Sequence, residues 1–219
     1  MSLNYNDQMD NEFRRKIVYY ENHYLEFFET LTPDVQKKFN WTLQLISTVD
    51  RVPEKYFKHL SNSSGIYEIR VEYSSNIYRV FCFFDKGNLI MLTNGFQKKT
   101  QKTPKGELEL AENLKNNISM KKMENKLKSF TDHLDEQYGK RGTKAREKYE
   151  EEFEAFKLGV MIQELRKEKG MTQEELALKC GTTKNYISRI ENNASDIRLS
   201  TLMRIIHEGL GGHLRLSVS

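Results

Sequence analysis

The sequence predicts an α+β N-terminal domain with a small, mostly antiparallel sheet, followed by an all-α C-terminal domain that ends in a short strand. Two observations carry this fold class. Residues 65–73 and 77–84 are rich in aromatic and β-branched residues, as strands are, and side chains of residues 66–73 alternate between two faces. After about Ser119 the chain is rich in Glu, Lys and Leu, and its apolar residues recur at helical spacing. The change of pattern near Ser119 predicts the boundary between the domains.

Composition excludes several classes of protein. The 219 residues are 30% charged and 37% hydrophobic, with a net charge of +4. No run of about 18 apolar residues is present, and the polar start of the chain lacks the pattern of a secretory signal. The two cysteines, Cys82 and Cys180, provide no disulfide framework and favour a reducing compartment. We therefore expect a cytoplasmic protein without membrane partners, whose charge permits nucleic-acid binding without requiring it.

The first domain, residues 1–119, is predicted to surround its strands with helices. The expected elements are a strand at Arg15–Tyr20, a short helix at Asn22–Glu29, a helix from Pro33 to about Val49, strands at Ile66–Tyr73, Ile77–Phe84 and Asn88–Gly95, and a helix at Glu107–Asn117. Pro33 suits the first turn of its helix, where the missing N–H has no partner to lose. Lys58 and His59 are assigned to a loop before the sheet.

A connecting segment, residues 120–157, and a helical domain, residues 158–219, follow. The expected helices are Asn125–Gln137, Thr143–Phe156, Leu158–Glu168, Gln173–Lys179, Lys184–Asn192 and Leu199–Glu208. Glycines at positions 209, 211 and 212 end the last helix, and His213–Val218 then alternates as a terminal strand does. This strand would either pair two protomers or pack against its own domain.

Residues 172–191 carry the most specific motif, a helix-turn-helix. Thr172 can cap the first helix, Glu175 would complete a capping box, and Gly181 can adopt the left-handed conformation at the helix end. The predicted buried face consists of Leu176, Cys180, Ile187 and Ile190, with Ala177 small at the helix crossing. The positions that can contact phosphates or base edges are Gln173, Thr182, Thr183, Lys184, Asn185, Ser188, Arg189 and Asn192. The alternative is a helix pair with no DNA role.

This motif resembles the Cro/repressor-like helix-turn-helix family of the xenobiotic-response-element (XRE) type, over roughly Leu158–Leu210. The resemblance implies that the domain binds operator DNA. Dimers of such domains read palindromic sites, so we expect a homodimer formed through the C-terminal domain.

Two arginines are expected on one face of the hairpin in the first domain. Glu68, Arg70 and Glu72 share a face because side chains alternate along a strand. A two-residue turn at residues 74–75 would place Arg70 opposite Arg79, whereas a turn one residue later would pair Arg79 with Glu72. Facing arginines repel each other, and an anion between them would remove the repulsion. The alternative is a surface face on which Glu68 and Glu72 neutralise both arginines.

A basic segment without acidic residues extends from Lys86 to Lys105 and includes the predicted strand Asn88–Gly95 and the residues that follow it. Its lysines are Lys86, Lys98, Lys99, Lys102 and Lys105. Lysine and arginine supply much of the affinity of proteins for a phosphate backbone, which favours an RNA site. The alternative is a solvated basic loop.

Residues 65–70, 77–81 and 94–104 resemble the RelE/ParE superfamily of toxins, most closely its HigB-like, phage-derived branch, over about Lys16–Leu114. The resemblance implies a RelE-like fold and a ribosome-associated mRNA endoribonuclease that needs no metal and no cofactor. Residues 130–218 similarly resemble the HigA-type antitoxin, with matching strings at 135–142 and 151–159. The chain would then hold a toxin and its antitoxin, which bind each other. Met120-Lys-Lys-Met123 looks like an internal start, which fits a natural fusion, an engineered one or two overlapping genes read through.

Candidate roles follow from this resemblance. Arg70 and Arg79 would bind the scissile phosphate, and Lys98 and Lys99 would bind RNA, one of them with a lowered pKa acting as acid or base. Some members of the resembled family use a tyrosine or histidine near the end of the last strand as the general base. This chain has other polar residues there, so His59 is the substitute candidate for the base. The alternative is that His59 is a surface loop histidine without a catalytic role. The remaining predicted RNA contacts are Lys58, Gln101 and Lys102.

The helices of residues 125–156 are expected to cover the basic RNA surface and keep the intact chain inactive as a nuclease. The covering acids would be Asp132, Asp135, Glu136 and the run Glu150–Glu154, although that run would equally suit a solvated helix face. A competing interpretation is a transcription regulator whose N-terminal domain is catalytically inactive or senses a ligand or partner. A third is an inactive nuclease retained for docking of the antitoxin part.

Overall fold

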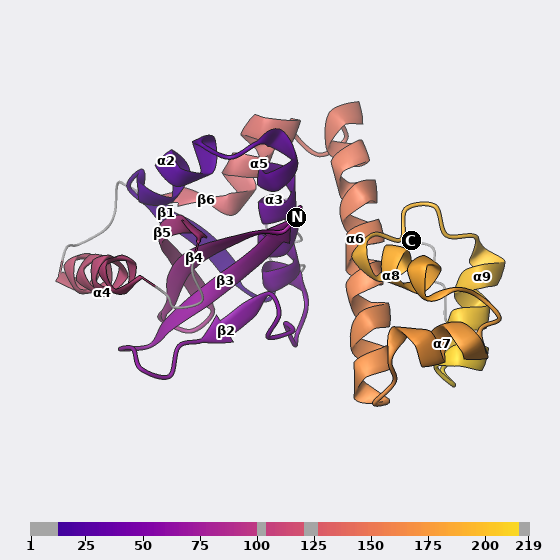
Figure 1. Cartoon of the computed structure of the whole chain (residues 1–219). Helices are drawn as coiled ribbons and strands as arrows, with labels where there is room; N and C mark the ends of the chain where they lie inside the picture. Colours follow the sequence, from indigo (N-terminus) through magenta and orange to yellow (C-terminus); the bar gives the residue numbers. More distant parts are fainter. Residues whose placement is uncertain (1–12, 100–103, 121–126, 215–219) are drawn as a thin grey trace. The chain divides into compact units, whose positions relative to one another are not determined.

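The computed structural model describes residues 13–99, 104–120 and 127–214. These residues fall into two compact units, Met1–Lys140 and Arg141–Ser219 (Figure 1). In the described parts of the chain, no helix combines the length and the apolar character that crossing a bilayer requires. The two units match the predicted fold class, an α+β region with a mixed sheet and then a helical region.

A six-stranded sheet forms the centre of the first unit, in the order β2-β3-β4-β5-β1-β6. Its strands are β1 (Lys16–Tyr20), β2 (Phe57–His59), β3 (Ile66–Tyr73), β4 (Asn76–Asp85), β5 (Leu89–Lys98) and β6 (Leu127–Ser129). Strands β1 and β5 are parallel, and the other neighbouring pairs are antiparallel. The sheet is therefore mostly antiparallel, as the sequence predicts.

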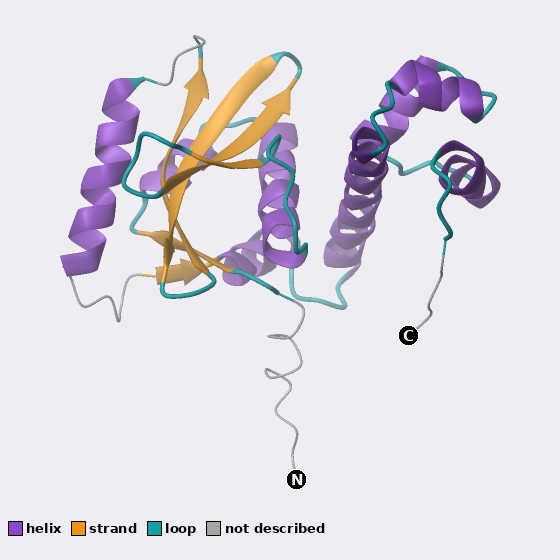
Figure 2. Cartoon of the chain, turned by 90° about the horizontal axis from the view of Figure 1, so that it is seen from below, coloured by secondary structure: helices purple, strands orange, loops and turns teal. Residues whose placement is uncertain are grey.

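Helices cover both faces of the sheet (Figure 2). Helix α4 (Lys105–Met120) packs on one face, where Ala111 and Ile118 join a buried cluster with Phe81 and Phe83 of β4. Helices α2 (His23–Glu29) and α3 (Pro33–Thr48) lie on the other face. Gly95 of β5 permits the close approach of α2, because a Cβ there would lie 2.1 Å from the Phe27 ring.

The hairpin between β3 and β4 has the first of the two predicted registers, the one with its turn at residues 74–75. Ser74 and Ser75 form a two-residue turn with φ values of 45° and 66°, the positive pair that a tight hairpin turn needs. Tyr73 is therefore opposite Asn76, and Arg70 is opposite Arg79. The turn fixes which side chains share a face along the whole hairpin.

Two short strands correct the sequence prediction. Lys58 and His59, predicted as a loop, belong to β2, and residues 127–129, predicted as part of the helix Asn125–Gln137, are β6, which pairs with β1. Three-residue strands are too short to display a period, and their partners lie far away in the sequence. The helix that follows β6 is α5 (Phe130–Tyr138), capped by the Ser129 side chain, which accepts a hydrogen bond from Asp132 N.

Strand β6 and helix α5 belong to the core of the first unit. The His133 ring of α5 lies edge-on to Tyr19 and Phe28, with centroids 5.6 and 5.0 Å away. Asn40 of α3 donates its Nδ2 to Gln137 Oε1 at 2.6 Å. The segment predicted as one connection, residues 120–157, is thus divided between the two units.

The second unit is helical among its described residues. It comprises α6 (Lys144–Glu168), α7 (Gln173–Lys179), α8 (Lys184–Asn192), α9 (Leu199–Arg204) and the π-helical turn η1 (Ile205–Gly209). The separate helices predicted at 143–156 and 158–168 are one continuous helix. Gly159 does not break it but allows close packing, since a Cβ there would lie 2.5 Å from Ile190 O. Of the predicted terminal strand, His213 and Leu214 are irregular, and residues 215–218 lie outside the described residues.

Candidate functional site

The arginine pair of the first unit shares one buried carboxylate. Arg70 and Arg79 face each other across β3 and β4, on the face that α4 packs against. Glu68 lies on the same face, and its side chain is only 2% exposed. One of its oxygens accepts from Arg70 Nε at 2.6 Å, and the other lies 3.2 Å from Arg79 Nε. The structure thus contains part of the second alternative: Glu68 pairs with both arginines, but it is buried and offsets only one of their two positive charges.

The two arginines differ in their access to solvent. The side chain of Arg79 is 7% exposed and donates Nη1 to Tyr78 O at 2.9 Å. Burial lowers the pKa of Arg79, an effect that the neighbouring Glu68 opposes. The side chain of Arg70 is 26% exposed. An anion from solvent can therefore reach Arg70. The buried Arg79 pairs with Glu68 inside the fold and keeps the Glu68 carboxylate in position.

Two predicted lysines share the arginine face. Lys98 lies opposite Ile77, two residues beyond the pair Arg79 and Phe96, and is half-buried. Lys58 of β2 lies opposite Glu68 and pairs with Glu54 at 3.2 Å. Lys99 follows β5 and is exposed. Gln101 and Lys102 lie outside the described residues.

His59 is separated from the arginines by the sheet. It lies opposite Tyr67, whose side chain points to the other face, and the two ring centroids are 4.9 Å apart. Phe57 stacks on the same tyrosine at 5.0 Å. The structure thus does not bring His59 together with Arg70 and Arg79, because side chains alternate along β2.

Helix α5 does not cover the arginine face, contrary to the prediction. Its His133 packs against Tyr19, which is on the α2 and α3 side of the sheet. Among its acids, Asp132 accepts from the Ser129 hydroxyl and Glu136 pairs with Lys128. Asp135 also lies on this helix. The acidic run Glu150–Glu154 belongs to α6 in the second unit.

The helix-turn-helix of the second unit forms as predicted. Thr172 accepts from Glu175 N at 3.2 Å, and Thr172 N donates to the Glu175 carboxylate at 2.7 Å, which completes the capping box. Gly181 has a φ of +59° at the end of α7. The four predicted core residues, Leu176, Cys180, Ile187 and Ile190, are buried in one cluster, and Ala177 joins them.

A buried polar network joins α6, α7 and α8. Glu191 is 1% exposed and accepts from Arg166 Nη2 at 2.9 Å, Gln173 Nε2 at 2.8 Å and Gln163 Nε2 at 3.3 Å. Burial raises the pKa of Glu191, but these hydrogen bonds outweigh it and lower the pKa overall. Gln173, predicted as a DNA contact, uses its amide in this network. Sequence reasoning missed the other three residues, although Gln163 and Arg166 flank the buried Ile162 helical face.

The predicted DNA contacts from Thr182 onward lie at or near the surface. Thr183 caps α8 by accepting from Tyr186 N at 3.2 Å, and Lys184 lies 3.7 Å from Glu174. Asn192 donates to Ser188 O at 2.8 Å. The exposed or half-exposed set is Thr182, Thr183, Lys184, Asn185, Ser188, Arg189 and Asn192. These side chains form one polar surface along and just before α8.

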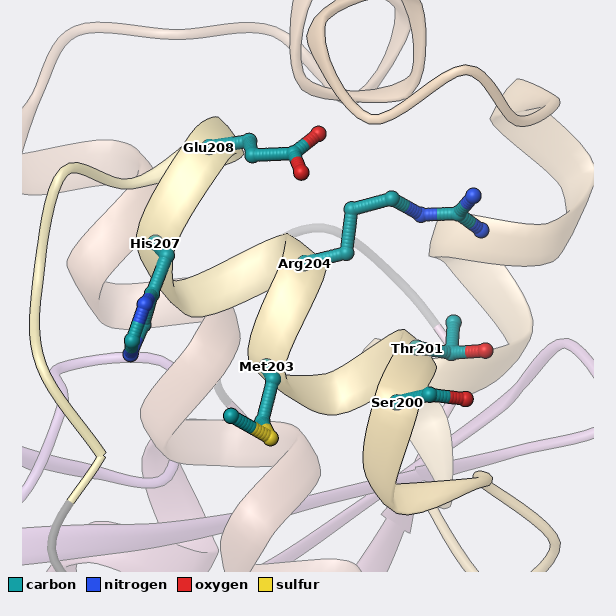
Figure 3. Close-up of a pocket in the computed structure, with 6 residues that line it drawn as sticks. All are labelled: Ser200, Thr201, Met203, Arg204, His207 and Glu208. Carbon is teal, nitrogen blue, oxygen red and sulfur yellow. The ribbon is translucent and has the colours of Figure 1, made fainter.

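A hollow of about 430 Å³ lies on α9 and η1 (Figure 3). Ser200, Thr201, Met203, Arg204, His207 and Glu208 line it. Met203 is exposed, as is Leu199 one turn earlier. Arg204 and Glu208 have no ion-pair partner among the described residues. This surface combines exposed apolar groups with one charge of each sign.

Comparisons with known proteins agree with this division. Residues 26–116 match the family described as phage derived protein Gp49-like, and residues 162–208 match a helix-turn-helix family. The triclinic structure of the wild-type restriction-modification controller protein C.Esp1396I is 39% identical, covering 28% of this chain and 78% of that one, with a TM-score of 0.27. Another structure of the wild-type controller is also 39% identical, covering 27% and 75%, with a TM-score of 0.26. No curated protein matches the chain. Residues 26–116 are thus similar to the Gp49-like family, and residues 162–208 are similar to helix-turn-helix domains.

Proposed function

We propose that the chain is a toxin–antitoxin module in one polypeptide. In this proposal the helix-turn-helix domain binds operator DNA and represses its own gene. The Gp49-like domain is an endoribonuclease that needs no metal, acts on mRNA at the ribosome in the cytoplasm, and is restrained in the intact chain. The observation that carries the proposal is the polar surface of α8, which the buried hydrogen-bond network around Glu191 holds in place.

The α8 surface suits the major groove. Lys184 and Asn185 start the helix, and residues at the start of a recognition helix reach base edges and phosphates in this class of domain. Arg189 adds a guanidinium one turn further. The Arg166–Glu191 network fixes α8 against α6 and α7, so these side chains are presented on a rigid support.

DNA binding can be tested with the full chain. Selection from a pool of random duplexes should enrich one sequence, and its Kd is then measured over a series of salt concentrations. Lys184→Ala should reduce the slope of log Kd against log salt by about 1, and Asn185→Ala should weaken binding by roughly 5- to 150-fold. Lys157→Ala, which removes a charge from α6, is the control. The proposed surface would be contradicted if Lys184→Ala and Asn185→Ala changed the Kd and its salt dependence no more than Lys157→Ala does.

The α9 and η1 surface supports a homodimer. A two-fold axis places the same surface on both protomers, so Arg204 of one copy can meet Glu208 of the other around Met203. Such a dimer would present two α8 helices to the two halves of a palindromic site. Met203→Glu should convert a sedimenting dimer into a monomer and weaken binding to the full site. A variant that stays dimeric would place the interface elsewhere.

The arginine face supports RNA cleavage in the first unit. Attack by a 2′-OH on the phosphate needs stabilisation of the charge that builds up, which Arg70 can supply, with Lys98 on the same face of the sheet. Arg79 and Glu68 act as positioning residues that hold the Arg70 guanidinium. One of Lys98 and Lys99 would take the proton from the 2′-OH as base or give a proton to the leaving 5′-oxygen as acid, and water would complete the other transfer. His59 has no part in this mechanism because it lies on the other face.

Cleavage can be tested with the chain in intact form and after cutting at a protease site introduced at residues 139–142, between the two units. The cut chain should cleave mRNA on ribosomes and the intact chain should not. Arg70→Ala should slow single-turnover cleavage by about 100-fold or more, as loss of one charge-stabilising donor does. Arg14→Ala, an exposed arginine paired with Asp50, is the control. A folded cut chain without activity would favour a regulator with an inactive first domain.

A further inference from the structure

We infer that Tyr186 is a positioning residue for base recognition, because its ring holds the Arg189 guanidinium in the orientation that reads a guanine. This inference rests on the proposed DNA-binding function and makes it more specific. It concerns one contact on α8, where the Arg189 Cζ lies 5.1 Å from the centroid of the Tyr186 ring.

The Tyr186 ring is a fixed support. It is half-buried and packs against the core cluster of the helix-turn-helix, which includes the buried neighbours Ile187 and Ile190. Arg189 is exposed and lies three residues later, on the same side of α8. An arginine above the face of an aromatic ring is attracted by the ring quadrupole, which restricts an otherwise flexible side chain. The tyrosine therefore converts a mobile surface arginine into an oriented one.

Other groups near Arg189 do not hold its guanidinium. A cavity of about 170 Å³ borders both side chains and is also lined by Asn193 and Asp196. Within the described residues, Asn193 accepts from Ser195 N, and Asp196 makes no ion pair with Arg189. The aromatic ring is thus the contact that orients Arg189.

The orientation matters because a guanidinium donates in its own plane. When one face of the plane lies on a ring, the N–H groups at the edge stay free to donate to the O6 and N7 atoms of guanine. Asn192 competes less well as a reading residue, since its amide already donates to Ser188 O. The expected recognition element is therefore a guanine in the major groove, bound by Arg189 through two hydrogen bonds.

The test uses the full chain and the duplex selected from the random pool. Each guanine of that duplex is replaced in turn by 7-deazaguanine, which lacks the N7 acceptor. For the wild type, one replacement should weaken binding by about 5- to 150-fold. Tyr186→Phe keeps the ring and should keep this ratio. Tyr186→Leu removes the ring and should bring the ratio close to 1, while the salt dependence of binding to unrelated DNA stays the same.

Arg189→Lys serves as a second variant in case the leucine variant does not fold. It keeps the charge without the plane, and it should lose the 7-deazaguanine effect. The inference is overturned if the leucine variant keeps the wild-type ratio, or if the phenylalanine variant loses it as fully as the leucine variant does. A wild-type chain that enriches no sequence from the pool would instead remove the operator-binding function, and this inference with it.

Discussion

Each unit of this protein buries a glutamate against arginine, yet the two clusters are built differently. In the second unit, one carboxylate, Glu191, meets one guanidinium, Arg166, and two amides. In the first unit, one carboxylate, Glu68, meets two guanidiniums. The Glu191 cluster of the second unit balances its charges within the fold, whereas the Glu68 cluster of the first unit leaves an excess positive charge.

The comparison shows what distinguishes a structural ion pair from a candidate site. Arg166 is almost fully buried and also donates to Met171 O at 2.6 Å, so its donors are used inside the fold. Arg70 is a quarter exposed, and its excess charge faces solvent. A buried ion pair is therefore weak evidence of function by itself. Charge balance and access to solvent separate the two clusters.

Removing the Glu191 carboxylate should have the largest effect. Glu191→Ala leaves Arg166 buried without its counter-charge, which typically costs about 3–5 kcal/mol of unfolding free energy. Amide hydrogen exchange in α7 and α8 would measure the loss. Glu174→Ala removes a 77% exposed carboxylate that lies 3.7 Å from Lys184, and it should change exchange little. Equal exchange in both variants would show that the network does not stabilise the domain.

Acid should weaken the same network. The folded pKa of Glu191 is lowered from its ordinary value of 4.5, so the stability it contributes is present above pH 4.5. That contribution is lost as the pH falls through the lower folded pKa. Exchange in α7 and α8, compared with that of a Glu191→Gln variant, should show the decline only for the wild type.

His133 tests the opposite situation, a basic side chain whose burial outweighs the attraction of the nearby Glu136 carboxylate. Burial, followed by the charge of Lys128, lowers the pKa of His133 to about 4, from 6.5. The unfolded chain therefore binds the proton at a higher pH than the folded chain, and the first unit should lose stability as the pH falls from 6.5 to 4. Each unit of pKa difference corresponds to about 1.4 kcal/mol.

The fluorescence of the single tryptophan, Trp41, can follow unfolding of the first unit in urea. His133→Phe keeps an aromatic ring between Tyr19 and Phe28 and should flatten the pH dependence in this window. If the wild type and the phenylalanine variant respond equally to pH, other groups account for the loss.

Glu68→Gln should have a smaller effect than loss of Glu191. Glutamine keeps an oxygen acceptor beside the buried Arg79, and the partly exposed Arg70 can turn to solvent. The expected loss is therefore that of one hydrogen bond to a charged group, about 1.5–3 kcal/mol. Urea unfolding followed by Trp41 would measure it. Glu72→Gln, an exposed acid on the same face of the same strand, is the matched control. A loss as large as that of Glu191→Ala would mean that the two clusters are equally structural.

The sequence carries the long periodic elements and the helix-turn-helix, but not the contacts between distant segments. Strand β3 has the predicted bounds, and the capping box at Thr172 formed as predicted. Strand β6 was missed because its partner β1 lies at the other end of the first unit and three residues show no period. Glu68 and Glu191 became recognisable as buried only once packing was known, because an isolated acid in a sequence normally indicates surface.

The smallest expected effect concerns the turn that sets the register of the arginine face. Ser75 has a φ of 66°, a conformation that costs an L-residue about 1–2 kcal/mol and glycine much less. Because glycine also loses more backbone entropy on folding, Ser75→Gly should stabilise the first unit by only about 0.5 kcal/mol. Urea unfolding would measure this, with Ser61→Gly, at an exposed position without positive φ, as the control. The Ser75 variant should gain stability and the Ser61 variant should not. Equal changes would mean that the turn stores no strain, and that the pairing of Arg70 with Arg79 is fixed by the strands alone.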